Sequence, residues 1–182
     1  MLGSLVFLTT RLLIVADCVA LVLLGITVYL TRATLRRVVG ALIGGFTVTL
    51  LIVAVDALAR ERGWWSYPNV STPYGLPLMY LAAALWYGAG VALIGWRLTR
   101  RFGWRGLVGL VGAATILGPM RDYAYAARTG VIVFAAGTTP ALLDASCWGC
   151  GIALAQGILR LVAGPARSDR LRQRTVWRQK TG

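Results

Sequence analysis

Two stretches near the start of the chain are too long and too apolar for a water-soluble fold. Residues 12–30 read LLIVADCVALVLLGITVYL, and residues 38–58 read VVGALIGGFTVTLLIVAVDAL. A helix needs about 20 apolar residues to cross the hydrocarbon core of a bilayer. Charged residues make up 14% of the chain, whereas an ordinary soluble domain carries about 25%. The sequence therefore predicts an all-α, polytopic integral membrane protein.

The breaks between apolar segments predict a bundle of about five transmembrane helices. We expect them at about residues 11–31, 38–58, 76–97, 104–119 and 141–163. The stretch 119–140 mixes charges with a short apolar run, which suits a re-entrant or interface-lying piece buried against protein. The alternative is a helix of its own at 129–150, which would raise the count to six.

Basic residues gather in alternate connections. Residues 31–37 hold three arginines, 97–105 hold four, and 164–182 hold six basic residues against one acid. Excess Lys and Arg in short loops mark the cytoplasmic side, so five spans place the N-terminus outside and the C-terminus inside. We thus expect a membrane bundle over 1–163 and a basic cytoplasmic tail over 164–182.

The net charge of +13 does not indicate a nucleic-acid partner, because the charges lie in loops and a tail. It favours a bilayer with anionic lipids in its inner leaflet. The near-exclusive use of Arg over Lys indicates a bacterial protein of the inner cell membrane. The chain has no His, which excludes His-ligated zinc or haem. We predict no metal site, and no cofactor is indicated.

Three acids fall inside the apolar spans, at Asp17, Asp56 and Asp144. The predicted topology places all three toward the outer leaflet. Ionisable groups within a membrane are costly and are candidate functional positions. The competing interpretation is that Arg–Asp pairs simply tie helix ends together.

Aromatic and charged residues in the outer loops extend this candidate ligand site. They are Trp64, Trp65 and Tyr67 in one loop and Arg121 and Asp122 in the next. Together with the acids, these rings favour a small hydrophobic or cationic ligand. Alternatively, the rings lie at the headgroup level as ordinary interface anchors.

Cys147 and Cys150 form a Cys-x-x-Cys pair in the last apolar span. Such a pair can exchange electrons with a quinone or a thiol carrier. Two cysteines packed in a helix as small apolar residues are the simpler interpretation.

Small residues spaced four apart allow membrane helices to approach closely. The spacing occurs at Gly40 with Gly44, at Gly109 with Ala113 and at Gly151 with Ala155. Each pair indicates either packing within the chain or a face that docks another subunit.

The chain has no recognisable catalytic constellation, so we predict a small non-catalytic subunit of a larger membrane complex, with other membrane subunits as partners. A second hypothesis is a binding or transport protein with an outer-leaflet pocket. A third is a membrane enzyme acting on a lipid, quinone or isoprenoid, with Asp17 or Asp144 as acid or base.

Overall fold

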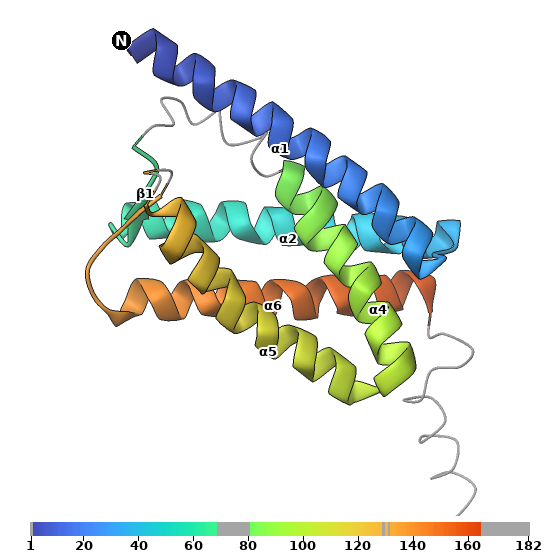
Figure 1. Cartoon of the computed structure of the whole chain (residues 1–182). Coiled ribbons are helices and arrows are strands. Elements are labelled where there is room, and N and C mark those ends of the chain that lie inside the picture. Colours follow the sequence, from blue (N-terminus) through green and yellow to red (C-terminus); the bar gives the residue numbers. More distant parts are fainter. Residues whose placement is uncertain (1, 69–80, 129, 131, 165–182) are drawn as a thin grey trace, which may run out of the picture.

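The computed structural model describes residues 2–68, 81–128, 130 and 132–164 (Figure 1). Five α-helices, two π-helical segments and two very short strands make up this part of the chain. In order they are α1 (Leu2–Thr31), α2 (Leu35–Glu61), β1 (Trp65–Ser66), η2 (Ala83–Gly90), α4 (Val91–Phe102), α5 (Trp104–Arg121), η3 (Asp122–Ala126), β2 (Val133–Phe134) and α6 (Thr138–Ala163). The predicted all-helical architecture is confirmed, and the tail after residue 164 lies outside the described residues.

Three helices in the described residues are long and apolar enough to cross a membrane: Ile14–Thr31 within α1, all of α2 and all of α6. Their length and composition make this a multi-pass membrane protein. The expected span 104–119 falls short of the same measure because glycines and two terminal arginines lower the mean hydropathy of α5. The start of the expected span 76–97 lies outside the described residues.

The helices begin earlier than the sequence pattern predicts. Helix α1 begins at Leu2 instead of residue 11, because the apolar residues that precede Arg11 continue the helix. Helix α2 begins at Leu35 and ends at Glu61, and α6 begins at Thr138, each three residues outside the expected bounds.

Helices α2 and α6 run antiparallel and form the centre of the bundle (Figure 1). A side chain at Gly44 would place its Cβ 2.7 Å from the carbonyl oxygen of Ala155. Glycine there lets the two backbones meet, which is how helices associate in a solvent that gives no hydrophobic driving force. On the other side of α2, η2 packs against Gly45, where an added Cβ would lie 2.9 Å from the Ala89 amide.

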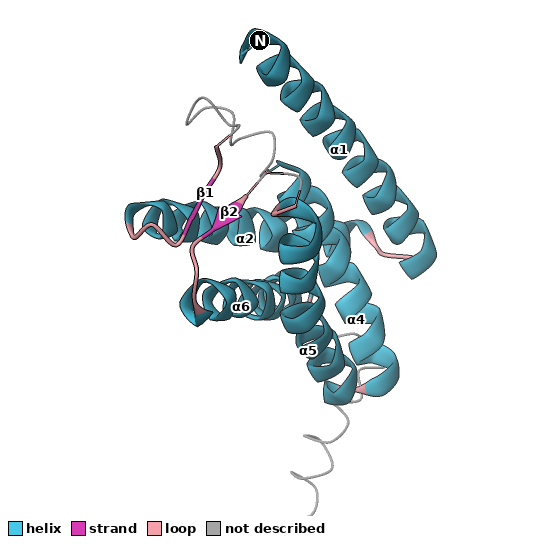
Figure 2. Cartoon of the chain, turned by 60° about the vertical axis from the view of Figure 1, so that its left-hand side comes forward, coloured by secondary structure: helices cyan, strands magenta, loops and turns pink. Residues whose placement is uncertain are grey.

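Helix α1 leans across the bundle and contacts η2 and α4 (Figure 2). Large apolar side chains on it stay exposed, including Val22, Ile26 and Leu30. Much of the surface of α1 is therefore left for lipid or for another chain.

Two residues of the apolar run before α6 form a short strand, β2. Val133 and Phe134 of β2 pair antiparallel with Ser66 and Trp65 of β1. Gly137 has a φ of 121° and precedes α6, so the alternative helix over 129–150 is wrong. The re-entrant or interface-lying placement of 119–140 stays a prediction. The β-branched residues at 131–133 favour the extended backbone.

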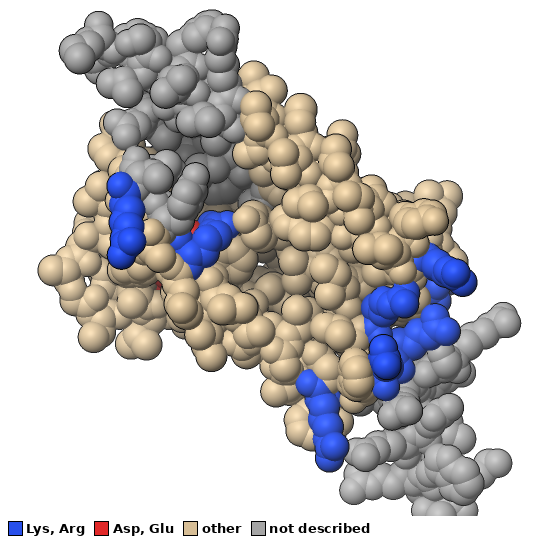
Figure 3. Space-filling view, viewed as in Figure 1, with Lys and Arg blue, Asp and Glu red and all other residues tan. Residues whose placement is uncertain are grey.

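Charged side chains divide between the two ends of the bundle (Figure 3). We call one the arginine end, where α1, α4 and α6 terminate. Its arginines include Arg32, Arg36, Arg37, Arg97, Arg100 and Arg101, and Arg160 lies in the last turn of α6. Arg36 Nε donates to the Val162 carbonyl at 3.0 Å, and Arg97 Nη1 donates to the Leu30 carbonyl at 2.7 Å. These bonds satisfy carbonyls that a helix end leaves without partners.

Arg32 closes α1 in a conformation that is unusual for a side chain with a Cβ. Its φ is 50°, in the left-handed region, while Ala33 N donates to the Val28 carbonyl at 3.2 Å. Glycine usually occupies this position of a helix terminus.

Arg32→Gly is expected to raise the free energy of unfolding by about 1 kcal/mol, because glycine adopts the left-handed backbone without steric strain. Thermal unfolding of the detergent-solubilised chain measures the change. Arg32→Ala keeps the strained backbone and is the matched control. A gain of equal size in both variants would contradict this account of position 32.

Candidate functional site

The opposite end of the bundle gathers three carboxylates that come from separate elements. Asp56 lies in the last two turns of α2, Asp122 begins η3, and Asp144 lies in the second turn of α6. The charges of Asp122 and Asp56 both act on Asp144, as does that of Arg121. We call these four residues the carboxylate cluster.

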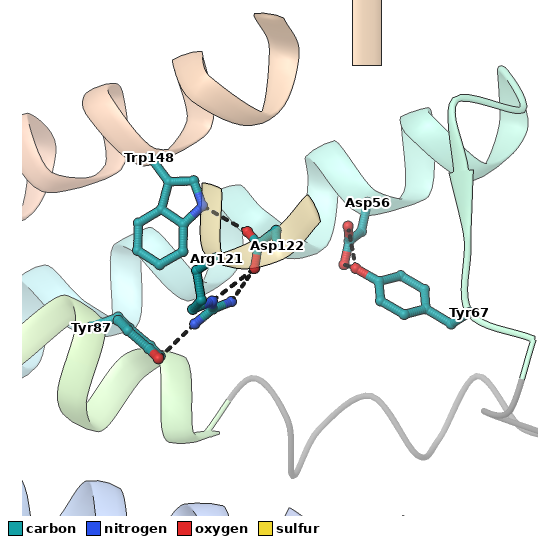
Figure 4. A network of polar contacts seen from close by, with 6 residues as sticks. All are labelled: Asp56, Tyr67, Tyr87, Arg121, Asp122 and Trp148. Atoms are coloured by element: carbon teal, nitrogen blue, oxygen red, sulfur yellow. Dashed lines mark hydrogen bonds and ion pairs between the residues drawn. The ribbon is translucent and has the colours of Figure 1, made fainter. Parts of the chain in front are cut away.

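Asp56 is 4% exposed and is held by two aromatic donors from the loop that follows α2. The Trp65 indole donates to Oδ1 at 2.8 Å, and the Tyr67 hydroxyl donates to the same carboxylate at 3.0 Å (Figure 4). Burial, followed by the charge of Asp56, raises the pKa of the Tyr67 hydroxyl far above its usual value. Tyr67 therefore stays protonated and remains a donor, so Asp56 fastens the loop to the helix.

Asp122 is also buried, and its partners come from two other helices. Arg121 forms an ion pair with it and donates through Nη1 to the Tyr87 hydroxyl at 2.6 Å. The Trp148 indole donates to Asp122 Oδ2 at 2.9 Å (Figure 4). The Arg121 guanidinium also lies 5.1 Å from the centre of the Trp148 ring, which is within cation–π range. This network joins η2, α5, η3 and α6.

Local backbone features place these side chains. A Cβ at Gly118 would collide with the Trp148 ring, so glycine there makes room for the indole that reaches Asp122. Tyr87 lies in η2 and Asp122 in η3. Both segments are π-helical, and such wide turns are frequent at functional sites.

Asp144 differs from the other two acids because its Oδ2 is buried without a hydrogen-bond partner in the described residues. The Tyr123 hydroxyl is buried in the same way, and the charge of Asp144 acts on it. The Tyr123 ring stacks on Phe134 with the ring centres 4.1 Å apart. Asp144 and Tyr123 thus carry buried polar atoms that no other described residue satisfies.

Asp17 and Trp64 stand apart from these contacts. Asp17 lies on α1 near the backbone of Ala82, with both carboxylate oxygens buried and without a well-placed hydrogen bond. Trp64 is half-buried and joins the loop through its backbone, whose carbonyl accepts from Ala135 N at 2.8 Å. The structure thus brings together six of the eight predicted ligand residues: Asp56, Trp65, Tyr67, Arg121, Asp122 and Asp144.

Cys147 and Cys150 are free thiols on α6, and Cys150 is exposed on the outside of the helix. A redox role for the pair stays a prediction. No three His, Cys, Asp or Glu side chains of the described segments come together in a way that could hold a metal ion.

Tyr87, Tyr123 and Trp148 join the site in addition to the eight predicted ligand residues. Their side chains reach the acids only after α5, η2 and α6 have packed. The sequence carries one weak signal for two of them. Tyr87 and Trp148 fall toward the same side of the predicted bundle as Asp122 and Asp144.

The chain matches no known protein family, no curated protein and no solved structure. Its function must therefore be argued from its own residues.

Tyr67→Phe is expected to lower the free energy of unfolding by about 1–3 kcal/mol, because the buried Asp56 carboxylate loses a donor. The midpoint of thermal unfolding in detergent measures the loss. Trp64→Phe is the matched control in the same loop, since no side-chain hydrogen bond of Trp64 is found in the described part. Equal losses in the two variants would show that the Asp56 bond is not what holds the loop.

Proposed function

We propose that this chain is a small non-catalytic subunit of a larger membrane complex. The proposal includes a five-span topology in a bacterial inner membrane, with the arginine end on the cytoplasmic side. The carboxylate cluster supports it. Asp56 and Asp122 are engaged in hydrogen bonds and an ion pair that join separate elements, so neither acid is free to act as a catalyst.

The observation that carries the proposal is the outward face of α5. Gly109 and Gly112 have nothing within 4 Å of an added Cβ. Large apolar side chains flank them on the exposed surface, namely Val108, Ile116, Leu117 and Met120. Ala113, four residues after Gly109, is exposed as well. Small residues at this spacing let a second helix approach closely, and no helix of the described chain occupies the place.

The other two small-residue pairs supply the contrast. Gly40 and Gly44 pack against Leu159 and Ala155, and Gly151 packs against Val48. Both pairs therefore lie inside the bundle, in the contact between α2 and α6. The pair Gly109 and Ala113 alone among the three faces outward, which favours a transmembrane helix of another subunit as its occupant.

Site-specific photo-crosslinking tests this interface. A photoreactive amino acid replacing Gly112 in the cell should crosslink one membrane protein, identified by mass spectrometry. Gly109→Leu should abolish the crosslink, because a leucine there prevents the close helix approach. The same photoreactive residue at Gly157, an equally open glycine on α6, is the control position.

Lipid alone crosslinked at both positions would overturn the proposal, as would a crosslink to a second copy of this chain. Gly157→Leu controls for leucine on a lipid-facing surface, and sizing of each variant in detergent verifies that it folds.

A second candidate function is the binding of a hydrophobic cation at the carboxylate cluster. The unpartnered Asp144 Oδ2 favours it, since three acids there face two arginines, Arg121 and Arg60. Acids and aromatic rings together suit an organic cation.

Tetraphenylphosphonium is a suitable probe for this second function. Asp144→Asn should weaken its binding by about tenfold, because one opposing charge is removed. Glu61→Gln removes an exposed acid at the same end of the bundle and should leave binding unchanged. Isothermal titration of the detergent-solubilised chain measures both. Equal affinities in the two variants would remove this candidate.

A further inference from the structure

A cavity of about 1150 Å³ opens at the arginine end, between the last turn of α1 and α4. Arg32, Arg97, Arg100 and Arg101 line it together with Trp96. Figure 3 shows basic side chains gathered at this end of the molecule. The apolar end of α1 around Leu30 forms another part of the cavity wall.

These arginines have no acidic counterpart in the described part of the chain. The ion pair found in the described part of the chain joins Arg121 to Asp122, and it lies at the opposite end of the bundle. Asp17, on the same helix as Arg32, precedes Thr31 by 14 residues, or about 21 Å along a helix. Four guanidinium groups around one cavity repel one another, and a bound anion relieves that repulsion.

Trp96 supplies a second, independent sign of a ligand. It is 4% exposed, and its indole Nε1 is buried without a hydrogen-bond partner in the described residues. The Arg37 guanidinium lies 4.2 Å from its ring centre, and that of Arg100 lies 5.9 Å away. A buried N–H donor without an acceptor is unfavourable, and it belongs to a residue that lines the cavity.

The left-handed backbone of Arg32 is a third sign. A non-glycine residue in this region is disfavoured, and such strain clusters at ligand sites. Glycine would close α1 more easily but would bring no guanidinium to the cavity.

We propose that this cavity binds the phosphate group of an anionic ligand, either a phospholipid headgroup or a small phosphorylated molecule. Planar guanidinium groups bind phosphate oxygens through two parallel N–H bonds. The cavity is far larger than one phosphate, and its apolar wall suits the carbon skeleton that carries the phosphate. This site is independent of the α5 interface and of the carboxylate cluster.

Binding to the full chain in an uncharged detergent tests the proposal. The probes are dioctanoyl phosphatidylglycerol, dioctanoyl phosphatidylcholine and inorganic phosphate, measured by native mass spectrometry and isothermal titration. Arg100→Gln and Arg32→Gly should each weaken binding by about tenfold, the weight of one charge-assisted contact. Arg105→Gln is the matched control, because Arg105 is exposed nearby but does not line the cavity.

Arg100-dependent binding of phosphatidylglycerol, without binding of phosphatidylcholine, identifies a site for an anionic lipid headgroup. Arg100-dependent binding of inorganic phosphate alone identifies a small phosphorylated ligand, and both results support the phosphate site. Equal binding of the two lipids overturns it, as does an equal loss in Arg100→Gln and Arg105→Gln, or no binding of any probe. Arg32→Gly keeps the test decisive if Arg100→Gln fails to fold, because glycine suits the backbone at position 32.

Discussion

Helices α2 and α6 lie against each other because Gly44 has no side chain to hold them apart. Lipid gives apolar helices no reason to associate, so contacts between them depend on close packing. The same device recurs around this centre. Glycine at position 45 admits η2, and glycine at position 118 admits the Trp148 ring, so the polar network forms where the helices are already in close contact.

The two ends of the bundle treat charge in opposite ways. At the carboxylate cluster, Asp56 and Asp122 receive donors from aromatic side chains of the chain itself, whereas Asp144 Oδ2 has no partner in the described residues. At the arginine end, guanidinium groups reach helix carbonyls but meet no carboxylate in the described residues. Asp56 and Asp122 are thus held by internal bonds at one end, while the guanidinium groups around the cavity at the other end have no acid among the described residues.

The sequence predicts much of this architecture because long apolar runs have few possible structures. Helices lie in all five expected regions: α1 starts nine residues early, α2 and α6 start three residues early, and α5 starts at residue 104 as expected. The start of the span expected at 76–97 lies outside the described residues. The placement of Asp56, Asp122 and Asp144 at one end follows from counting residues along alternating helices. Their separation from Asp17 does not, since it depends on the lean of α1 across the bundle.

Other features could not be predicted because tertiary contacts decide them. The β1–β2 pair joins segments almost 70 residues apart, which no local pattern records. The π-helical register of η2 and the left-handed Arg32 depend on what packs around them. The choice between an internal and an external role for the glycine pairs likewise needed the positions of the neighbouring helices.

The π-helical register of η2 has a mechanical consequence. A π-helical turn holds one more residue than an α-helical turn, and one residue turns a helix by about 100°. Tyr87 faces Arg121 within η2, and Trp96 faces Arg37 nine residues later on the same continuous helix. If η2 tightened into α-helical register, the second half would swivel relative to the first, and one of these contacts would have to break. The continuous η2–α4 helix therefore carries a residue of each polar end, and its register fixes how the two face relative to each other.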